Sequence, residues 1–445
     1  MKISKPASCI FIALFFLSIS NLCFAQYSIT GKVLNASNNL PLESATVFVN
    51  TTSYGTKTDK HGNFILHNVK AGYYELIFSM VGFRTYNAQV YVQHADKKVP
   101  TIILEEKVIP LIDVNITQTK KLGSRYIEMF KHEILGTSEF GKQCRIINPE
   151  VIKLNFDKEE NKLTAYSTDF MIIDNKALGY RLKYLVENFE RNEKTELISY
   201  VGYVLFEAMK GSEKQQQEWN EKRIEAYSGS LQHFLRSLLG NNINKYKETG
   251  FLVMTDTRME NMYRLPDLII NKKISLFKEK HSKTDQDSLF FWTSMLQQPK
   301  YIEVLDTTKL QTKQVVHLTD RKGLYSLRII TDTNYVNRWP SIKVHGIKRT
   351  DLRCDTCQFK NSLYVTYIKY IPEKSKKTYQ SLYRPSSSIA PTPEMDKMAS
   401  LISILNGNVF FDWNGVIVNP MNLKLERYWA KLRLGDLLPI DYAPM

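Results

Sequence analysis

Residues 29–85 read ITGKVLNASNNLPLESATVFVNTTSYGTKTDKHGNFILHNVKAGYYELIFSMVGFRT, and this stretch decides the fold of the N-terminal part. Short runs of β-favouring residues alternate with turns such as residues 59–62, whose glycine tolerates a positive φ. In residues 73–79 the second, fourth and sixth positions are apolar, whereas the opposite face, which includes Ile77, is mixed. Short strands separated by turns at this spacing predict a β-sandwich.

Several short motifs of this stretch occur together in one known family. They are Gly31-Lys32-Val33, Pro41-Leu42, Ala45-Thr46-Val47, Gly62-Asn63-Phe64, Gly72-Tyr73-Tyr74 and Val81-Gly82-Phe83. With them, residues 26–107 resemble the carboxypeptidase-regulatory-like domain, a transthyretin-like β-sandwich. The resemblance implies a module that accompanies zinc carboxypeptidases without being their catalytic unit. None of the eight histidines is followed by Glu in a His-x-x-Glu pair, so peptidase activity of that type is excluded.

The same domain opens many TonB-dependent outer-membrane transporters, and residues 111–116 look like the stretch that leads into their plug. Only about 325 of the 445 residues remain beyond that stretch. A plug and a 22-stranded barrel need more, at about ten residues per strand before loops. The likeness to transporters therefore covers the first module only. A role as an accessory or assembly factor for such a transporter stays open as an alternative.

Residues 1–25 have the order of a secretory signal peptide. Two lysines precede an apolar run at residues 9–19, and a small-residue cleavage site follows at residues 23–25. The apolar run is shorter than the ~20 residues that span a bilayer, and no later segment approaches that length. Leu22 argues against lipid attachment at Cys23. We expect an exported protein without a transmembrane span in its mature form, in the periplasm or at the outer membrane or surface of a gram-negative bacterium.

The formal net charge is +15, and nearly all of the excess lies after residue 107. A basic surface favours acidic partners. For an exported chain these are an envelope protein, an anionic envelope polymer or anionic lipid, whereas nucleic acid is a poor candidate. The alternative is a solvated basic surface without a partner.

Residues 108–120 are interpreted as a linker, and residues 121–445 as an α+β region rich in antiparallel strands. Helix-favouring patterns lie at residues 125–135, 213–227, 231–239 and 395–405. Strand-like runs lie at residues 151–168, 179–187, 197–206, 251–255, 288–293, 301–305, 314–318, 324–331, 341–347, 362–371, 408–418 and 423–429.

The segment at residues 213–239 holds the candidate site residues. Arg223, His233 and Arg236 could converge on an anion, and Ser230 next to His233 could form a nucleophile–base pair. No Gly-x-Ser-x-Gly elbow and no orienting acid accompany that pair. The alternative is an amphipathic helical hairpin whose Arg and His side chains satisfy carbonyls or acidic neighbours.

Cys354 and Cys357 form a Cys-x-x-Cys pair between two strand-like runs. In an oxidising compartment a local disulfide is the favoured interpretation, with free thiols as the alternative. A zinc or redox site would need further ligands, for which only Cys144 and His345 offer themselves, or a helix after Cys357. We therefore predict neither a metal site nor a cofactor.

Residues 175–180, 219–238 and 429–442 resemble a group of uncharacterised envelope proteins that carry this region behind a carboxypeptidase-regulatory-like domain. That resemblance implies domain order and compartment but no activity. The sequence thus favours a non-catalytic binding or scaffolding protein of the cell envelope. A hydrolase of an envelope polymer, acting through Ser230 and His233, is the alternative.

Overall fold

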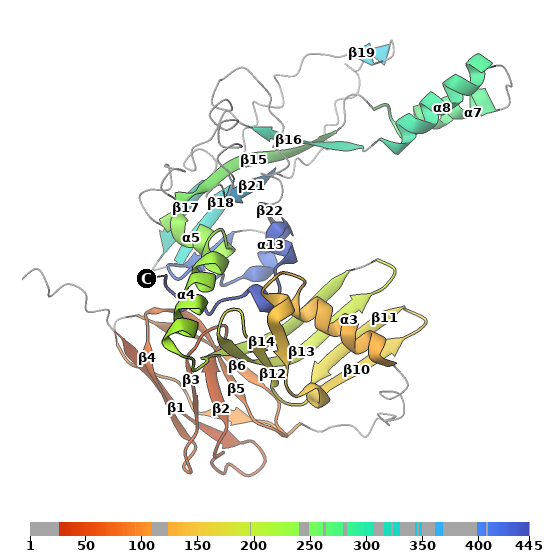
Figure 1. Ribbon diagram of the computed structural model, residues 1–445. Helices are drawn as coiled ribbons and strands as arrows, with labels where there is room; N and C mark the ends of the chain where they lie inside the picture. The colour runs from red at the N-terminus through yellow and green to blue at the C-terminus, as the bar shows by residue number, and fades with distance from the viewer. Residues whose placement is uncertain are drawn as a thin grey trace, which may run out of the picture. The chain divides into compact units, whose positions relative to one another are not determined.

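The chain divides into two compact units, residues 1–227 with 432–445, and residues 228–431. The boundary lies inside the stretch that was interpreted as one α+β region. The computed structural model (Figure 1) describes residues 26–93, 95–107, 123–195, 197–239, 249–260, 264–278, 283–298, 300–306, 316–321, 324–329, 343–344, 347–348, 361–367, 398–405 and 408–444.

The first unit begins with a sandwich of two four-stranded sheets. One sheet pairs β4 (Asn63–Val69), β1 (Tyr27–Asn35), β7 (Lys97–Lys98) and β8 (Ile102–Leu104), the last two both alongside β1. The other has the order β3 (Gly55–Lys57), β2 (Thr46–Val49), β5 (Gly72–Ser79) and β6 (Tyr86–Val92). The predicted N-terminal sandwich is confirmed.

Apolar side chains of both sheets form the core of the sandwich. Phe64 and Phe78, one from each sheet, meet edge to face with ring centroids 5.6 Å apart. Leu76 and Phe78, on the face that the alternation in β5 predicted to be apolar, are fully buried. Ile77, on the mixed face, is also fully buried, which the alternation alone does not explain.

A six-stranded antiparallel sheet outside the sandwich, which we call the second sheet, completes the first unit. Its strands are β9 (Cys144–Ile146), β10 (Ile152–Asp157), β11 (Lys162–Ser167), β12 (Met171–Asn175), β13 (Tyr180–Asn192) and β14 (Ile198–Ala208). The long strand β13 pairs with β14 on one side and with β11 and β12 on the other. Helix α3 (Gly123–Leu135) packs Phe130 and Ile134 against this sheet (Figure 1). The helix ends where Gly136 takes a φ of +85°.

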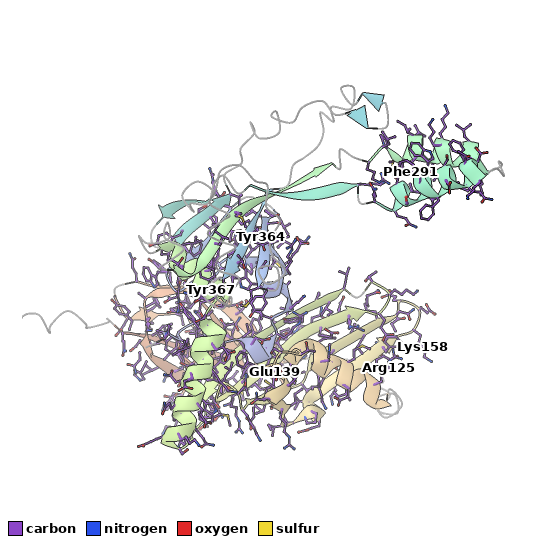
Figure 2. The ribbon with its side chains drawn as sticks, turned by 45° about the horizontal axis from the view of Figure 1, so that its top comes forward. Arg125, Glu139, Lys158, Phe291, Tyr364 and Tyr367 are labelled. Carbon is purple, nitrogen blue, oxygen red and sulfur yellow. The ribbon has the colours of Figure 1, made fainter. Side chains whose placement is uncertain are left out.

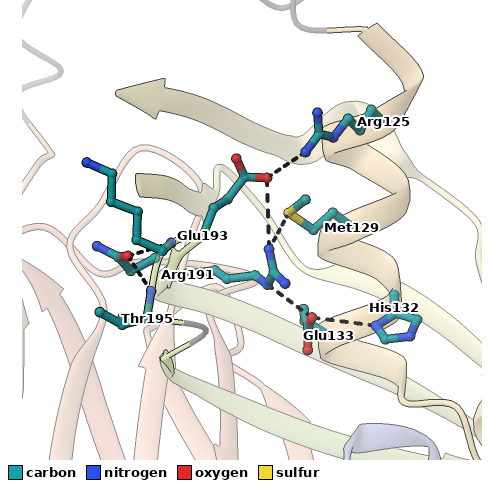
Figure 3. A network of polar contacts seen from close by, with 9 residues as sticks. Arg125, Met129, His132, Glu133, Arg191, Glu193 and Thr195 are labelled. Atoms are coloured by element: carbon teal, nitrogen blue, oxygen red, sulfur yellow. Dashed lines mark hydrogen bonds and ion pairs between the residues drawn. The ribbon is translucent and has the colours of Figure 1, made fainter. Parts of the chain in front are cut away.

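Ion pairs join α3 to the end of β13 (Figure 3). The Arg191 guanidinium lies 3.1 Å from the Glu133 carboxylate of the helix and 4.0 Å from Glu193. Arg125, in the first turn of α3, pairs with Glu193 at 3.0 Å. Since Arg191, Glu133 and Glu193 are each less than one-fifth exposed, the network is shielded from solvent more than most surface pairs.

Helix α4 (Glu213–Tyr227) ends the first unit, and α5 (Leu231–Leu239) begins the second. Both have the predicted bounds, and Gly229, with a φ of +82°, separates them. A sheet of the order β16 (Tyr301–Asp306), β15 (Phe251–Glu260), β21 (Asn361–Tyr367), β22 (Ala399–Ile404) and β24 (Leu423–Arg427) forms the centre of the second unit. The second unit also contains a small sheet of β17 (Val316–Arg321), β18 (Leu324–Ile329) and β23 (Val409–Asp412). Its other elements include the β19–β20 hairpin (Lys343–Val344, Ile347–Lys348) and the short helix α13 (Tyr428–Lys431).

Two predicted elements of the second unit are wrong in type. Residues 288–293, predicted as a strand, lie within helix α8 (Lys283–Gln297), which packs Met295 and Trp292 against α7 (Asp267–Lys278). Figure 2 shows Phe291 on this helix pair. Residues 395–405, predicted as a helix, contain strand β22, whose first four residues are buried in the middle of its sheet. A central strand buried on both faces lacks the alternation that distinguishes it from a helix.

No helix among the described residues is both long and apolar enough to cross a membrane. The predicted linker at residues 108–120 lies outside the described ranges.

Candidate binding site

The connection between β2 and β3, residues 50–53, joins the sandwich to β14 through the backbone. The Thr51 amide donates to the Val204 carbonyl at 2.8 Å, and the Phe206 amide donates to the Thr52 carbonyl at 2.9 Å. We call this contact the seam. It satisfies backbone groups on the outer side of β14 that an uncovered edge strand would expose.

An apolar cluster reinforces the seam. Phe48 and Ile77, from the outer face of the sandwich, are buried together with Leu205 of β14. Phe170 adds an edge-to-face contact to Phe48, with centroids 5.7 Å apart. A Cβ atom on Gly55 would come within 2.8 Å of Leu205 Cδ2, so glycine permits this close approach. The burial of Ile77 is thus a consequence of docking against the second sheet.

Residues 432–444, which we call the strap, return to the seam from the far end of the chain. The Ile440 amide donates to the Thr51 carbonyl at 2.8 Å. The amide and hydroxyl of Ser53 donate to the two carboxylate oxygens of Asp441, at 2.9 and 2.5 Å. The strap therefore fixes the β2–β3 connection through contacts across 388 positions of sequence.

The strap also packs against the start of the second sheet. The buried side-chain amide of Asn175 donates to the Gly435 carbonyl at 2.9 Å. A Cβ atom on Gly435 would lie 2.5 Å from both Gly141 Cα and the Leu135 carbonyl oxygen. Burial raises the pKa of the neighbouring Asp436 carboxyl above its usual value. Backbone against backbone at this distance leaves no room for any side chain at position 435.

A cavity of about 570 Å³ opens next to the seam, between the sandwich and the second sheet. Two rows of side chains, each in register across three strands, line it. The sandwich row consists of Lys57, Thr46 and Ser79. The row of the second sheet consists of Ile172, Lys183 and Leu205. Because both rows stand on sheets that the seam and the strap hold together, the walls are fixed by rigid elements.

Hydroxyl groups and balanced charges characterise the lining of this cavity. The hydroxyls belong to Ser44, Thr46, Ser53, Thr56 and Ser79. The charged residues are Lys57, Lys183, Asp169 and Glu207. The two lysines and the two acidic residues give the lining no formal net charge, and Lys183 pairs with Glu207 at 2.5 Å. Such a surface suits a neutral ligand with many hydroxyl groups better than it suits an anion.

The structure assigns Arg223 a local role in the first unit. Its Nε and Nη2 donate to the carbonyls of Leu178 and Gly179 at 2.7 and 3.0 Å, and the guanidinium lies 4.1 Å from the Tyr180 ring centroid. One turn earlier, Trp219 Nε1 donates to the Lys176 carbonyl at 2.9 Å. Arg223 thus helps to dock α4 on the turn before β13.

His233 and Arg236 belong to α5 in the second unit. His233 Nδ1 accepts a hydrogen bond from the Gly229 amide at 3.1 Å, and its ring packs on Phe251 and Tyr367. Arg236 Nε donates to the Asn414 carbonyl at 2.9 Å. The contacts of Arg223, His233 and Arg236 with backbone groups and aromatic rings are those expected from the alternative, a helical hairpin in which these side chains have a structural role.

Ser230 acts at the start of α5. Its hydroxyl accepts the His233 amide at 3.1 Å, which is the geometry of a helix N-cap. The imidazole nitrogen Nδ1 faces the backbone at Gly229, where a catalytic histidine would hold its orienting acid.

The cysteine pair Cys354 and Cys357 lies outside the described residues, as does His345. Cys144 is a free thiol, and burial together with the nearby Asp436 raises its pKa to about 12. The thiol is therefore protonated at neutral pH and a poor nucleophile. Across the part of the chain that the structure describes, no group of three His, Cys, Asp or Glu side chains is placed to hold a metal ion.

Sequence reasoning missed the cavity. Its residues come from six strands, β2, β3, β5, β12, β13 and β14, and from the connections next to them, and no sequence motif joins them. One signal was present, namely the apolar Ile77 on a face of β5 that a solvated sandwich would keep polar.

Comparison with protein families places one match on this chain. Residues 29–116 match the model of the CarboxypepD_reg-like domain, which confirms the resemblance read from the motifs. The match covers about a fifth of the chain. A comparison with curated proteins found no significant match.

Solved structures show local similarity to β-rich proteins. A mutant type II cohesin–X-dockerin complex from Acetivibrio cellulolyticus is 26% identical, with 18% of this chain and 58% of that chain covered and a TM-score of 0.17. The pilus 2b backbone protein of group B streptococcus is 16% identical over 18% and 42% of the two chains, with a TM-score of 0.16. The shaft pilin SpaA of Lactobacillus rhamnosus GG is 15% identical over 19% and 49%, with a TM-score of 0.16. Each match spans less than two thirds of the other chain, and scores this low carry no functional argument.

Proposed function

We propose that the chain is an exported, non-catalytic binding protein of the cell envelope, with the seam cavity as its ligand site. The observation that carries this proposal is the cavity of about 570 Å³, whose two walls stand on sheets locked together by the seam and the strap. A pocket on rigid walls loses less conformational freedom on binding than a pocket made of loops, which favours recognition. The regulatory-like domain then supplies one wall of the site, in keeping with a module that is not itself an enzyme.

The lining indicates the chemical class of the ligand. The Ser53 hydroxyl is already engaged with Asp441, but the hydroxyls of Ser44, Thr46, Thr56 and Ser79 and the Lys183–Glu207 pair supply both donor and acceptor groups to the lining. Phe170 and Met80 add apolar surface against which a sugar ring can pack. We therefore propose a short segment of a neutral, hydroxyl-rich envelope polymer as the ligand. The predicted anionic partner finds no charge excess in this cavity.

A binding experiment tests this function. The mature chain, residues 26–445, is titrated with neutral and anionic oligosaccharides, and binding is measured by isothermal calorimetry. Ser79→Phe, on the cavity wall, is expected to weaken binding of neutral oligosaccharides at least about tenfold, because the ring fills space that the ligand needs. Thr195→Phe, on an exposed turn away from the cavity, is the matched control and should bind as the unmodified chain does.

The same samples separate binding from hydrolysis. Chromatography of the oligosaccharides after long incubation should show no shortened products. Cleavage that disappears in His233→Ala would refute a non-catalytic role and support the Ser230–His233 alternative. Equal binding by the Ser79 variant would refute the cavity as the site while leaving the question of hydrolysis unaffected.

A further inference from the structure

Strand β6 is an edge strand without the usual protection. Its sequence, YNAQVYV, contains no charged residue and no proline, and it pairs with β5 over seven residues without a register shift. Among the described residues, β5 is its only strand partner. Edge strands of soluble proteins are usually shortened, bulged, charged or interrupted by proline, because a regular free edge pairs with other chains.

The side chains of β6 that face the sandwich core are buried at the end of the strand and exposed at its start. Val92 and Val90, opposite Gly72 and Tyr74 of β5, are buried. Tyr86 occupies the same face opposite the fully buried Phe78, yet it is 45% exposed. The sandwich core is therefore accessible at this end, as if one further strand belonged there.

A groove of about 520 Å³ lies between this side of β6 and the segment of β7 and β8. The opposite wall carries Val99 and Ile102, which are buried, and Ile103, which is 51% exposed. Its backbone is held from behind, since β8 pairs with β1 and the Val99 amide donates to the Thr30 carbonyl at 2.9 Å. Both walls thus belong to ordered strands that leave a channel between them.

The charge of the groove indicates what kind of strand enters it. Lys97 is the single charged residue of the lining, and the exposed Lys98 follows it. Neither forms an ion pair with another described residue, whereas the nearby Asp96 accepts the Ser28 amide and Glu106 accepts the Asn35 side chain. A second copy of this chain would bring the same lysines and a strongly positive formal charge with it, so like charges disfavour pairing between copies.

We propose that this groove receives an extended segment of a partner protein, which adds to β6 as a fifth strand. The segment has alternating apolar residues that enter the groove and acidic residues that meet Lys97 and Lys98. Main-chain hydrogen bonds to β6 supply affinity, and the groove and the lysines supply selection, as in other cases of strand addition. This docking surface is separate from the seam cavity.

A designed peptide serves as the probe. A fluorescent nonapeptide of alternating valine and glutamate is titrated with the full mature chain, and anisotropy is measured at low and high salt. It is expected to bind more tightly at low salt, and to bind roughly tenfold better than a nonapeptide of alternating valine and lysine. Hydrogen exchange of the complex should show new protection at residues 86–92 and no change in β14.

Two variants and a control locate the binding. Lys97→Glu should weaken binding of the acidic peptide roughly threefold to tenfold. Lys60→Glu, an exposed lysine in the 59–62 turn outside the groove, should leave it unchanged. Ala88→Trp, which fills the groove, should abolish binding, with circular dichroism to verify its fold. Absence of protection at β6, equal binding of both peptides, or a dimer in sedimentation that dissociates when β6 is altered would overturn the proposal.

Discussion

The sandwich has two margins that differ in what covers them. At the seam, the β2–β3 connection is paired with β14, sealed by Phe48, Ile77 and Leu205, and tied down by the strap. At β6, the described residues provide no further strand, and a groove reaches the core. The first margin is closed by other parts of the same unit, whereas the second is the margin at which we propose that a partner strand is added.

The strongest test of this difference compares two isoleucines of the same module. Ile77→Ala removes a fully buried side chain at the seam and is expected to cost about 3 kcal/mol, from lost burial and the cavity left behind. Ile103→Ala, at the groove, removes a half-exposed side chain and should change stability by less than about 0.5 kcal/mol. Urea unfolding of the full chain measures both. Equal decreases in the free energy of unfolding would mean that side chains at the groove contribute as much to the stability of the fold as those at the seam.

The next test concerns the strap. Gly435→Ala places a Cβ atom against the backbone at Gly141 and Leu135, so the strap must shift, at an expected cost of about 2 kcal/mol. Hydrogen exchange should then increase at the β2–β3 connection, because Ile440 and Asp441 hold it, while β6 stays unchanged. Leu437→Ala, two residues on and partly exposed, is the control with an expected small effect. An unchanged exchange rate at residues 50–53 would show that the strap does not secure the seam.

The smallest expected effect is a dependence on pH at the strap. Burial raises the pKa of the Asp436 carboxyl in the folded chain above its ordinary value of 3.8. A raised pKa means that the stabilising contribution is complete below pH 3.8 and is lost as pH rises through the folded pKa. The stability of the unmodified chain relative to Asp436→Asn should therefore fall as pH increases above about 4. Urea midpoints of the two chains, compared at each pH, measure this, and a difference that grows with pH in the opposite direction would contradict it.

Local sequence patterns were sufficient to predict elements whose burial pattern and end residues are visible within a few positions of sequence. The sandwich strands, the hairpin of β10 and β11, and helices α4 and α5 follow from period and turn residues and have the predicted places. The predictions for residues 288–293 and 395–405 were wrong because aromatic and apolar runs fit either a helix or a strand. Packing of α8 on α7, and the central place of β22, decided between the two.

The candidate site was less accessible to sequence reasoning. Arg223, His233 and Arg236 drew attention because charged and titratable residues on helices are conspicuous, yet the structure shows carbonyl, ring and amide contacts for them. The cavity is lined by hydroxyl residues that are scattered along the sequence, and the groove is lined by an edge strand. Neither arrangement has a sequence motif.

By itself, the sequence determined that the chain begins with a β-sandwich of the regulatory-like type, because alternation and turn chemistry act within a few residues. Only the tertiary structure decided that Ile77 is buried, that Asp441 holds Ser53, and that β6 pairs on one side alone within the part of the chain that the structure describes. These depend on contacts between segments up to 388 positions apart, and such contacts leave no periodic trace in the amino-acid order.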